Sequence, residues 1–452
     1  MPHDPPSIKF ETLLLHSPTS EWVSLLADER VGAWNWPYRP WRKVRPMARQ
    51  ANLDAEQAWT ALKSLRLGMW SPLPLHQANG RRFGLCQPPQ MSEALHRIDR
   101  ALGGGGAATL FSPDGPLADT DLQRRIVVRS LMDEAIDSSR IEGAVTTRKK
   151  ALELLRSGGA PRSKSDRMIV NNWQAMQWIK SRIDRPLDVE TLLKLQAILV
   201  EGTLDVEATG RLRTEADQVV IEDERTQEVV FTPPSAIGLE QRLVSLCEFA
   251  NSDHSGRNFL HPVMKACVLH FMIGYEHPFV DGNGRTARAA FYWSALRSGY
   301  RIFEYLVVSE LILKAFAKYP QAFIDTEDDD GDMTYFVAFK LGVIERAIDR
   351  FNDYLTREQS QIERSLAMLK RHPGLNLRQR LLLEHSLRHP KDDYTARSHA
   401  AANAVTAMTA RADLEGLLKR KLLSTYKVGK QVHYAAVPDL AQRLAPARKR
   451  RA

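Results

Sequence analysis

One short segment, EHPFVDGNGRTARAAFYW at residues 276–293, gathers the side chains best suited to chemistry. His277 titrates near neutral pH and suits a general base. Asp281 is a hard oxygen ligand of the kind that Mg²⁺ prefers. Arg285 and Arg288 lie three positions apart, so on a helix they share one face and can reach the same anion. The segment therefore predicts phosphoryl or nucleotidyl transfer.

The glycines between the acid and the arginines predict how an anion would be held. Gly282, Asn283 and Gly284 can adopt positive φ and bring main-chain N–H groups close to a ligand. Apolar periodicity resumes after Arg285, so we expect a helix to begin there, with a diphosphate or triphosphate at its N-terminus. The segment has no G-x-x-x-x-G-K-S/T pattern of a Walker A loop, and no strand precedes it as in a dinucleotide fingerprint.

The elements that must position this segment are mainly helical. A helix predicted over 261–277 carries a broad apolar stripe and would deliver the motif from its C-terminal end. Another helix is predicted over 119–143, where Gly143 ends it. Two β-rich runs at 219–221 and 229–232 flank a polar turn and predict a β-hairpin.

Composition divides the chain into three parts. Residues 1–106 are rich in tryptophan and proline and end in a glycine run at 103–106 that predicts a linker, and we expect a helical N-terminal extension here. Residues 118–360 are strongly helical and contain the motif. Residues 371–452 read as helix, turn, helix and then a hairpin with Gly429 at its tip. The predicted fold class is mainly α with small β elements.

Charge is distributed unevenly along these parts. The chain carries a net charge of +9, whereas residues 371–452 hold 17 lysines and arginines against 6 aspartates and glutamates. A basic tail on a near-neutral body indicates a polyanion partner such as DNA, and a solvated basic face is the alternative. The acidic run EDDDGD at 327–332 is interpreted as a solvated loop, with a metal site as the alternative.

Other features favour a cytoplasmic protein without a membrane partner. No apolar run approaches the roughly 18 residues that span a bilayer. The N-terminal residues have no basic start followed by a long apolar core, as a secretory signal would. Cys86, Cys247 and Cys267 are far apart and not in metal-ligand spacing, which fits reduced cysteines.

Residues 277–288, HPFVDGNGRTAR, resemble the complete signature of the Fic family, H-P-F-x-D/E-G-N-G-R-x-x-R. That family is an all-α domain with a β-hairpin flap, and most characterised members transfer AMP from ATP-Mg to a Ser, Thr or Tyr hydroxyl of a target protein. The resemblance implies His277 as the base and Asp281 as the Mg²⁺ ligand. No position departs from the signature, which favours an active member.

The resemblance also implies where the nucleotide and the target bind. The main chain of 282–284 and Asn283 would cradle the α-phosphate, and Arg285 and Arg288 would hold the outer phosphates. The hairpin at 219–232 falls where the family has its flap, on which a target segment adds as a strand and presents its hydroxyl. The residues expected to contact nucleotide are Asp281, Gly282, Asn283, Gly284, Arg285, Thr286, Ala287, Arg288 and, at the flap edge, Val230, Phe231 and Thr232.

A second match lies upstream. The sequence SSRIEG, with Ser138, Glu142 and Gly143 at its key positions, resembles the family's inhibitory motif S/T-x-x-x-E-G/N. In the family this glutamate pairs with the second arginine, here Arg288, and blocks a productive γ-phosphate pose. A carboxylate in the arginine fork competes with phosphate for the same donors. The same glutamate supports removal of AMP in some members, and that activity stays open here.

The C-terminal part, 371–452, resembles a winged helix-turn-helix. Thr406 and residues 409–418 would form its recognition helix, and Lys427, Lys430 and Gln431 would lie near the tip of its wing. Such a helix and wing could meet DNA phosphates. Asp413 within the recognition stretch, and the frequent use of winged helices to bind proteins, leave a protein partner open.

The sequence thus predicts an autoinhibited Fic-type protein adenylyltransferase that uses ATP and Mg²⁺. One alternative is a DNA-binding regulator that uses the Fic domain as a nucleotide sensor, although a sensor would not need His277. Another is a Fic enzyme that moves a different phosphate-containing group or removes AMP. The target protein, the choice between a monomer and a homodimer, and the signal that relieves inhibition are not written in the sequence.

Overall fold

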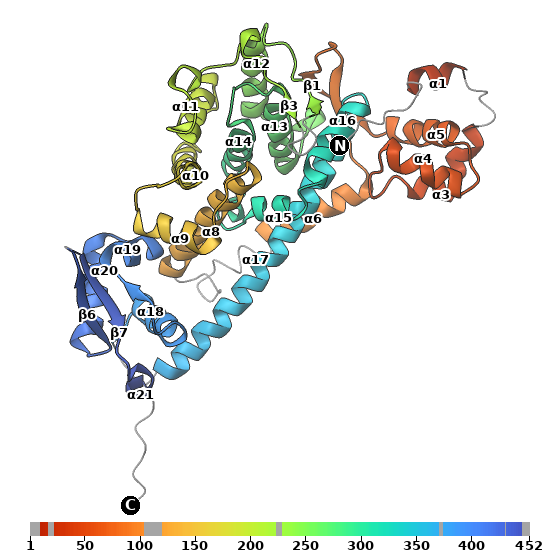
Figure 1. Cartoon of the computed structure of the whole chain (residues 1–452). Helices are drawn as coiled ribbons and strands as arrows, with labels where there is room; N and C mark the ends of the chain where they lie inside the picture. The colour runs from red at the N-terminus through yellow and green to blue at the C-terminus, as the bar shows by residue number, and fades with distance from the viewer. Residues whose placement is uncertain are drawn as a thin grey trace, which may run out of the picture.

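The computed structural model describes residues 10–16, 22–103, 120–222, 228–369, 374–429 and 431–444. The chain is mainly helical, as predicted, and the described residues also form three small antiparallel sheets. Figure 1 shows a cluster of N-terminal helices, a central helical body and a C-terminal unit at the far end of the long helix α17. No helix among the described residues is both long enough and apolar enough to cross a membrane.

The N-terminal helices build a small core of their own around tryptophans. Trp34, Trp41 and Trp59 are buried together, and the Asp54 carboxylate accepts N–H bonds at the start of α5. A two-stranded hairpin and one helix then lead toward the central body. The elements are α1 (Phe10–His16), η1 (Ser24–Ala27), α3 (Glu29–Ala33), α4 (Trp41–Gln50), α5 (Ala55–Leu67), β1 (Trp70–His76), β2 (Arg82–Cys86) and α6 (Pro89–Gly103).

The hairpin corrects the expectation that this extension is purely helical. Strand β1 contains Pro72 and Pro74, which count against a strand because proline cannot donate a ladder hydrogen bond. Within the described part of the chain β1 pairs only with β2, and its register shifts between Pro72 and His76, so the prolines are tolerated. The predicted linker at 103–106 lies outside the described residues except for Gly103, which ends α6.

Burial of the acidic run at 327–332 corrects the expectation of a solvated loop. Asp329 and Asp332 are almost fully buried. Lys63 Nζ lies 2.9 Å from Asp329 Oδ2, and the Tyr38 hydroxyl donates to Asp332 Oδ2 at 2.6 Å. Lys63 lies in α5 and Tyr38 in the turn between α3 and α4, so the acids attach the N-terminal cluster to the central body. No group of three or more metal-ligating side chains is found among the described residues.

The central body is organised around α13 and α14, which pack against each other and are buried on nearly all sides. The His261 side chain accepts the Val263 N–H at the start of α13, with Pro262 in the first turn. Its helices are α8 (Thr120–Ile141), α9 (Arg148–Ser157), α10 (Lys164–Lys180), α11 (Val189–Val200), α12 (Leu239–Asn251), α13 (Pro262–Glu276), α14 (Asn283–Arg297), α15 (Val308–Lys314), α16 (Lys318–Asp328) and α17 (Thr334–Leu369), with 3-10 turns η2 (Val206–Ala208), η3 (Glu215–Asp217), η4 (Gly256–Asn258) and η5 (Arg301–Glu304).

A short antiparallel hairpin interrupts the helices between α11 and α12. Strands β3 (Ile221–Glu222) and β4 (Val229–Phe231) pair with Ile221 opposite Phe231. The Phe231 ring lies 5.9 Å from the ring of Tyr275 in α13, so the hairpin packs against the helix that precedes the motif. The turn at 223–227 lies outside the described residues.

The C-terminal unit combines helices with a three-stranded sheet in the order β5-β7-β6. It packs on α8 and α9, where Arg397 Nη2 donates to the Gly158 carbonyl at 2.8 Å. Gly429 joins the two long strands at positive φ, and the predicted wing residue Lys430 lies outside the described residues. The elements are α18 (Leu377–Arg388), β5 (Asp393–Tyr394), α19 (Ala396–Asn403), α20 (Ala407–Lys419), β6 (Leu423–Val428), β7 (Gln431–Ala436) and α21 (Leu440–Leu444).

Candidate active site

The motif lies in the sharp connection between α13 and α14. His277 follows α13 directly and takes a left-handed conformation (φ 46°), with its N–H donated to the Ile273 carbonyl. Gly282 precedes α14 at φ 89°, where a side chain would be strained and would press on Val200. Helix α14 begins at Asn283, slightly earlier than predicted. The positive φ expected of this turn is found at Gly282 rather than at Gly284.

The His277 ring is held in the form that a general base needs. Its Nδ1 lies 3.1 Å from the Gly274 carbonyl oxygen, which can only accept, so Nδ1 carries the proton. Nε2 is therefore left with its lone pair in the neutral imidazole. Burial lowers the pKa of His277 below its ordinary value, which keeps the ring neutral at physiological pH.

Asn283 fixes the shape of the loop. Its Oδ1 accepts the Phe279 N–H at 2.9 Å, and its Nδ2 donates to the Phe279 carbonyl at 2.8 Å. Phe279 is fully buried, so these two bonds anchor the middle of the motif in the core. The predicted phosphate contact of the Asn283 side chain competes with this role, whereas its main-chain N–H lies in the first turn of α14.

The first turn of α14 is suited to an anion. Gly282 supplies no side-chain acceptor to the free N–H groups, which carry the positive end of the helix dipole. Glu142 brings a carboxylate to this turn, because a methyl group added at Gly284 would collide with Glu142 Oε1. The same methyl would lie 3.0 Å from Arg288 Nη1. One anion-accepting place is thus bounded by the helix start and Arg288, and Glu142 occupies it.

Arg288 joins the motif to the upstream SSRIEG segment. Its Nη2 lies 2.9 Å from Glu142 Oε1, and its Nε donates to Ser138 Oγ at 2.8 Å. Nη2 also donates to the Ser138 carbonyl, whereas Nη1 is buried and has no hydrogen-bond partner among the described residues. Gly143 follows at φ 83° and turns the chain away from α8. The predicted pairing of Glu142 with Arg288 is therefore present in the geometry.

Arg285 is engaged by the protein itself. It is about 1% exposed, and it donates to the Leu199 carbonyl at 2.9 Å and to Asp281 Oδ1 at 3.0 Å. Asp281 Oδ1 also accepts the Gly282 N–H, while Oδ2 makes no hydrogen bond within the described structure. The Asp281 side chain is 40% exposed, so one carboxylate oxygen faces outward.

Comparison with known proteins identifies the segment. Residues 186–295 match the model described as the Fic/DOC family. Residues 186–295 are therefore a Fic/DOC-type domain. The protein adenylyltransferase Fic of Nematostella vectensis is 23% identical to it over 289 residues, which cover 62% of this chain and 61% of that protein. The protein of the same name from Drosophila melanogaster is 40% identical over 68 residues, 15% of this chain and 13% of that protein.

Solved structures of Fic proteins are also similar. A Fic family protein from Desulfovibrio desulfuricans matches with 19% identity and a TM-score of 0.47, over 78% of this chain and 97% of that chain. Fic-1 from C. elegans matches with 19% identity and a TM-score of 0.45, over 69% of this chain and 84% of that chain. The chain spans less than two thirds of the length of the first curated relatives it matches.

The remaining predicted residues of the Fic domain lie at different depths. Thr286 and Ala287 are fully buried in α14, so their side chains face the core. Val230 and Phe231 lie in β4 and Thr232 directly follows it. The predicted contacts of these five residues with nucleotide stay predictions.

Two residues of the Fic domain that support the motif were not predicted from the sequence. Gln196 Nε2 donates to the Asp281 carbonyl at 3.1 Å. Arg213 donates to the His277 carbonyl at 2.8 Å. Both act on main-chain carbonyls more than 60 positions away, and no local pattern signals such contacts.

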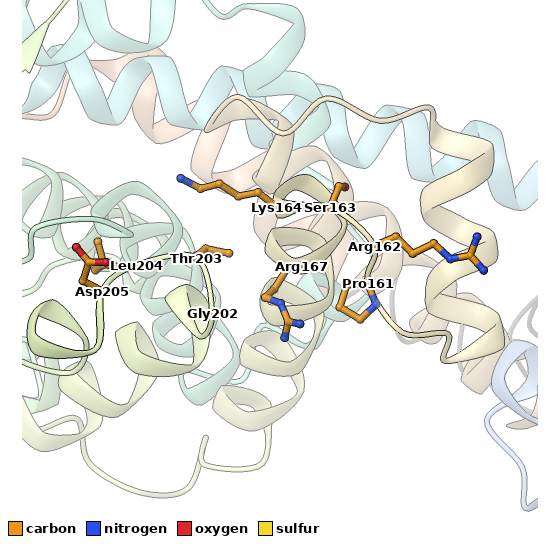
Figure 2. A pocket seen from close by; sticks show the side chains of 9 residues that line it. All are labelled: Pro161, Arg162, Ser163, Lys164, Arg167, Gly202, Thr203, Leu204 and Asp205. Carbon is orange, nitrogen blue, oxygen red and sulfur yellow. The ribbon is translucent and has the colours of Figure 1, made fainter.

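A surface pocket of about 590 Å³ has none of the motif residues in its lining. Figure 2 shows it between the N-terminal turn of α10 and the turn that follows α11. Lys164 and Arg167 extend along it, whereas Arg162 points away. It is lined by Pro161, Arg162, Ser163, Lys164, Arg167, Gly202, Thr203, Leu204 and Asp205.

Proposed function

We propose that this chain is a Fic-type protein adenylyltransferase that transfers AMP from ATP to a Ser, Thr or Tyr hydroxyl of a target protein. We propose further that Glu142 inhibits it. The Glu142 carboxylate carries the proposal, because it pairs with Arg288 next to Gly284 in the first turn of α14, where a phosphate would also be favoured. The names of the relatives, protein adenylyltransferase Fic, support the same reaction.

The side chains support the following reaction. His277 Nε2 takes the proton from the target hydroxyl as its oxygen attacks the α-phosphorus of ATP. The bond from that phosphorus to the β-phosphate oxygen breaks, and pyrophosphate leaves with the bonding electrons. The first-turn N–H groups of α14 stabilise the negative charge that develops on the α-phosphate oxygens. The locked tautomer of His277 favours this reaction over a role as a nucleotide sensor.

Asp281 fits a metal ligand. Its outward carboxylate oxygen is a hard donor, and Mg²⁺ beside a nucleotide usually takes only one or two carboxylates with phosphates and water. Mg²⁺ held there would neutralise charge on the phosphates. Arg285, bonded to the other oxygen, fixes the orientation of the carboxylate.

We propose that the β3–β4 hairpin is the flap on which a target segment docks. Addition of an extended peptide to a short antiparallel hairpin is a common mode of peptide recognition, and β3 and β4 form such a hairpin. The position of the hairpin beside α13, through Phe231 and Tyr275, supports a target hydroxyl close to His277. A homodimer stays a separate prediction.

We propose that the C-terminal unit is a winged helix. The order helix, strand, helix, helix, strand, strand supports this assignment. Met408 is 81% exposed at the start of α20, and Arg411 pairs with Glu415, so this face is less cationic than the sequence suggested. Asp413 points inward to Arg378. These contacts favour a protein partner as much as DNA, and salt-dependent binding of the full chain to duplex DNA distinguishes the two.

The proposed function is tested with labelled ATP and Mg²⁺ in a cell lysate. We expect the native protein to label weakly, Glu142→Ala to label itself or a target strongly, and Glu142→Ala with His277→Ala to label nothing. Absence of label with Glu142→Ala would refute the transferase. Pre-labelled protein that loses AMP faster with native enzyme than with Glu142→Ala would instead indicate AMP removal.

A further inference from the structure

Arg213, in the segment between α11 and the hairpin, holds the two halves of the Fic site together. Its side chain is about 7% exposed. Its Nε donates to the His277 carbonyl at 2.8 Å, and its Nη2 donates to the carbonyls of Pro234 and Glu276. Its own main-chain N–H donates to the Pro278 carbonyl at 2.9 Å. One arginine thus binds the end of α13, the catalytic loop and the chain that follows β4.

The carbonyls that Arg213 binds are those that fix the orientation of the base. His277 has a left-handed backbone that a non-glycine residue adopts only under constraint. The bonds from Arg213 to Glu276 and His277 hold the peptides on either side of that conformation. The imidazole direction depends on these peptides because the ring is also tied to Gly274 in the preceding turn.

The hydrogen bond from Arg213 to the Pro234 carbonyl connects the hairpin to the same side chain that holds His277. Pro234 lies three residues after β4, so its position sets where the strand enters the site. Arg242 reinforces the connection from α12. It pairs with the Glu276 carboxylate at 2.9 Å and donates to the carbonyls of Ser235 and Ile237 at 2.7 and 2.8 Å.

The chemistry of the group explains why arginine is needed. A planar guanidinium holds several N–H donors in a rigid fork, whereas a lysine ammonium is a single point charge on a flexible stem. Arg213 makes its three side-chain bonds to carbonyls on two separate segments at once. A lysine at this place would keep the charge but could not keep that geometry.

We infer that Arg213 is a positioning residue. It holds His277 and the β3–β4 hairpin at fixed positions relative to each other, so that the base lies within reach of a hydroxyl docked on the hairpin. This inference rests on the proposed function. The Arg213 side chain donates to main-chain carbonyls and not to the His277 ring, so it would act through the residues that it holds. Its effect is expected in the turnover of bound substrates, because a misplacement near 1 Å can cost about 100-fold in rate.

The test compares Arg213→Lys and Arg213→Ala with Arg211→Ala, all in the Glu142→Ala protein. Arg211 is a matched control from the same segment, because it pairs with Asp217 at the surface and does not reach the motif. We expect kcat for AMP transfer to fall about 10- to 100-fold in both Arg213 variants. KM for ATP should stay within about 2-fold, since the α14 anion site is untouched. Arg211→Ala should change neither.

Hydrogen exchange gives a readout that does not need activity. In Arg213→Lys, amides of 229–237 and 274–280 should exchange faster together, while α10 and α14 keep their protection. The acid limb of the kcat profile should move to higher pH in Arg213→Ala alone, because that variant removes a cation that lowers the pKa of His277.

Unchanged kcat in both Arg213 variants would overturn the inference. A uniform rise of exchange across the domain would also overturn it, since that marks general destabilisation. If Glu142→Ala transfers no AMP, the proposed function fails. Hydrogen exchange of residues 229–237 and 274–280 in Arg213→Lys then still decides whether Arg213 connects these two segments.

Discussion

Replacement of Glu142 by alanine tests the competition at Arg288 most directly. The Glu142–Arg288 contact is 2.9 Å long, with Arg288 almost fully buried and the Glu142 side chain 27% exposed. A charge-assisted hydrogen bond of this kind contributes about 1.5–3 kcal/mol, and the partial exposure favours the lower end. If phosphate competes with this carboxylate, its removal should tighten productive ATP binding by about 10- to 30-fold, the equivalent of roughly 1.5–2 kcal/mol.

The same change should weaken the protein without nucleotide. Arg288 would keep its two bonds to Ser138 but lose its only carboxylate partner within the described structure, and its Nη1 already has no partner. Leaving a buried cation short of a partner costs about 1–2 kcal/mol, which lowers Tm by roughly 2–6 °C in a domain of this size. ATP should recover this loss and stabilise the variant more than the native protein.

Calorimetric titration with a non-hydrolysable ATP analogue and thermal melts with and without it measure both effects. Glu142→Gln keeps an acceptor without the charge and should fall between native and alanine. Glu153→Ala, which removes an exposed glutamate from α9, is the matched control and should change neither quantity. Equal ATP affinity in native and Glu142→Ala proteins, together with an unchanged Tm, would refute the reasoning.

Three further predictions follow from the described contacts. His277→Asn should abolish AMP transfer but keep ATP binding. In the Glu142→Ala protein the acid limb of the kcat profile should lie below pH about 6.5, because burial lowers the pKa of His277 and keeps the ring neutral further into the acid range. An acid limb above that pH would contradict the burial argument. Gly284→Ala added to Glu142→Ala should lose ATP affinity in titration, because the methyl occupies the place bounded by Arg288, and retained affinity would put the phosphate elsewhere. Lys63→Met should lower the free energy of unfolding by about 3–5 kcal/mol in denaturant titrations, since it leaves Asp329 buried without its ammonium partner. Adding Asp329→Asn to Lys63→Met should recover part of this loss. Unchanged stability of Lys63→Met alone would argue against the buried network.

Local signals were sufficient to predict the motif and three of the helices around it, which the structure describes as α8, α13 and α14. Gly282 marks the turn into α14, and Asp54 and Thr406 cap the helices that follow them. Each of these signals lies within a few residues of the element it defines. The strand β1 is the local exception, because Pro72 and Pro74 are tolerated only where a strand lacks a second neighbour.

Long-range contacts could not be predicted in the same way. Lys63 and Asp329 are 266 positions apart, and neither segment carries a pattern that names the other. Arg213 binds main-chain carbonyls, which every residue possesses, so sequence alone gives no preference for His277. The Glu142–Arg288 pair was predicted only because both ends carry a recognisable motif.

The position of Glu142 upstream of the motif has a consequence for newly made protein. A ribosome releases the chain from its N-terminus, so α8 emerges before His277 and before α14. At about 5–20 residues per second, the 135 positions between Glu142 and His277 correspond to roughly 7–27 seconds of synthesis. On the proposed function, the inhibitory helix is therefore already present when the catalytic loop first folds. Inhibition is then the starting condition of each molecule, and activity has to be acquired afterwards.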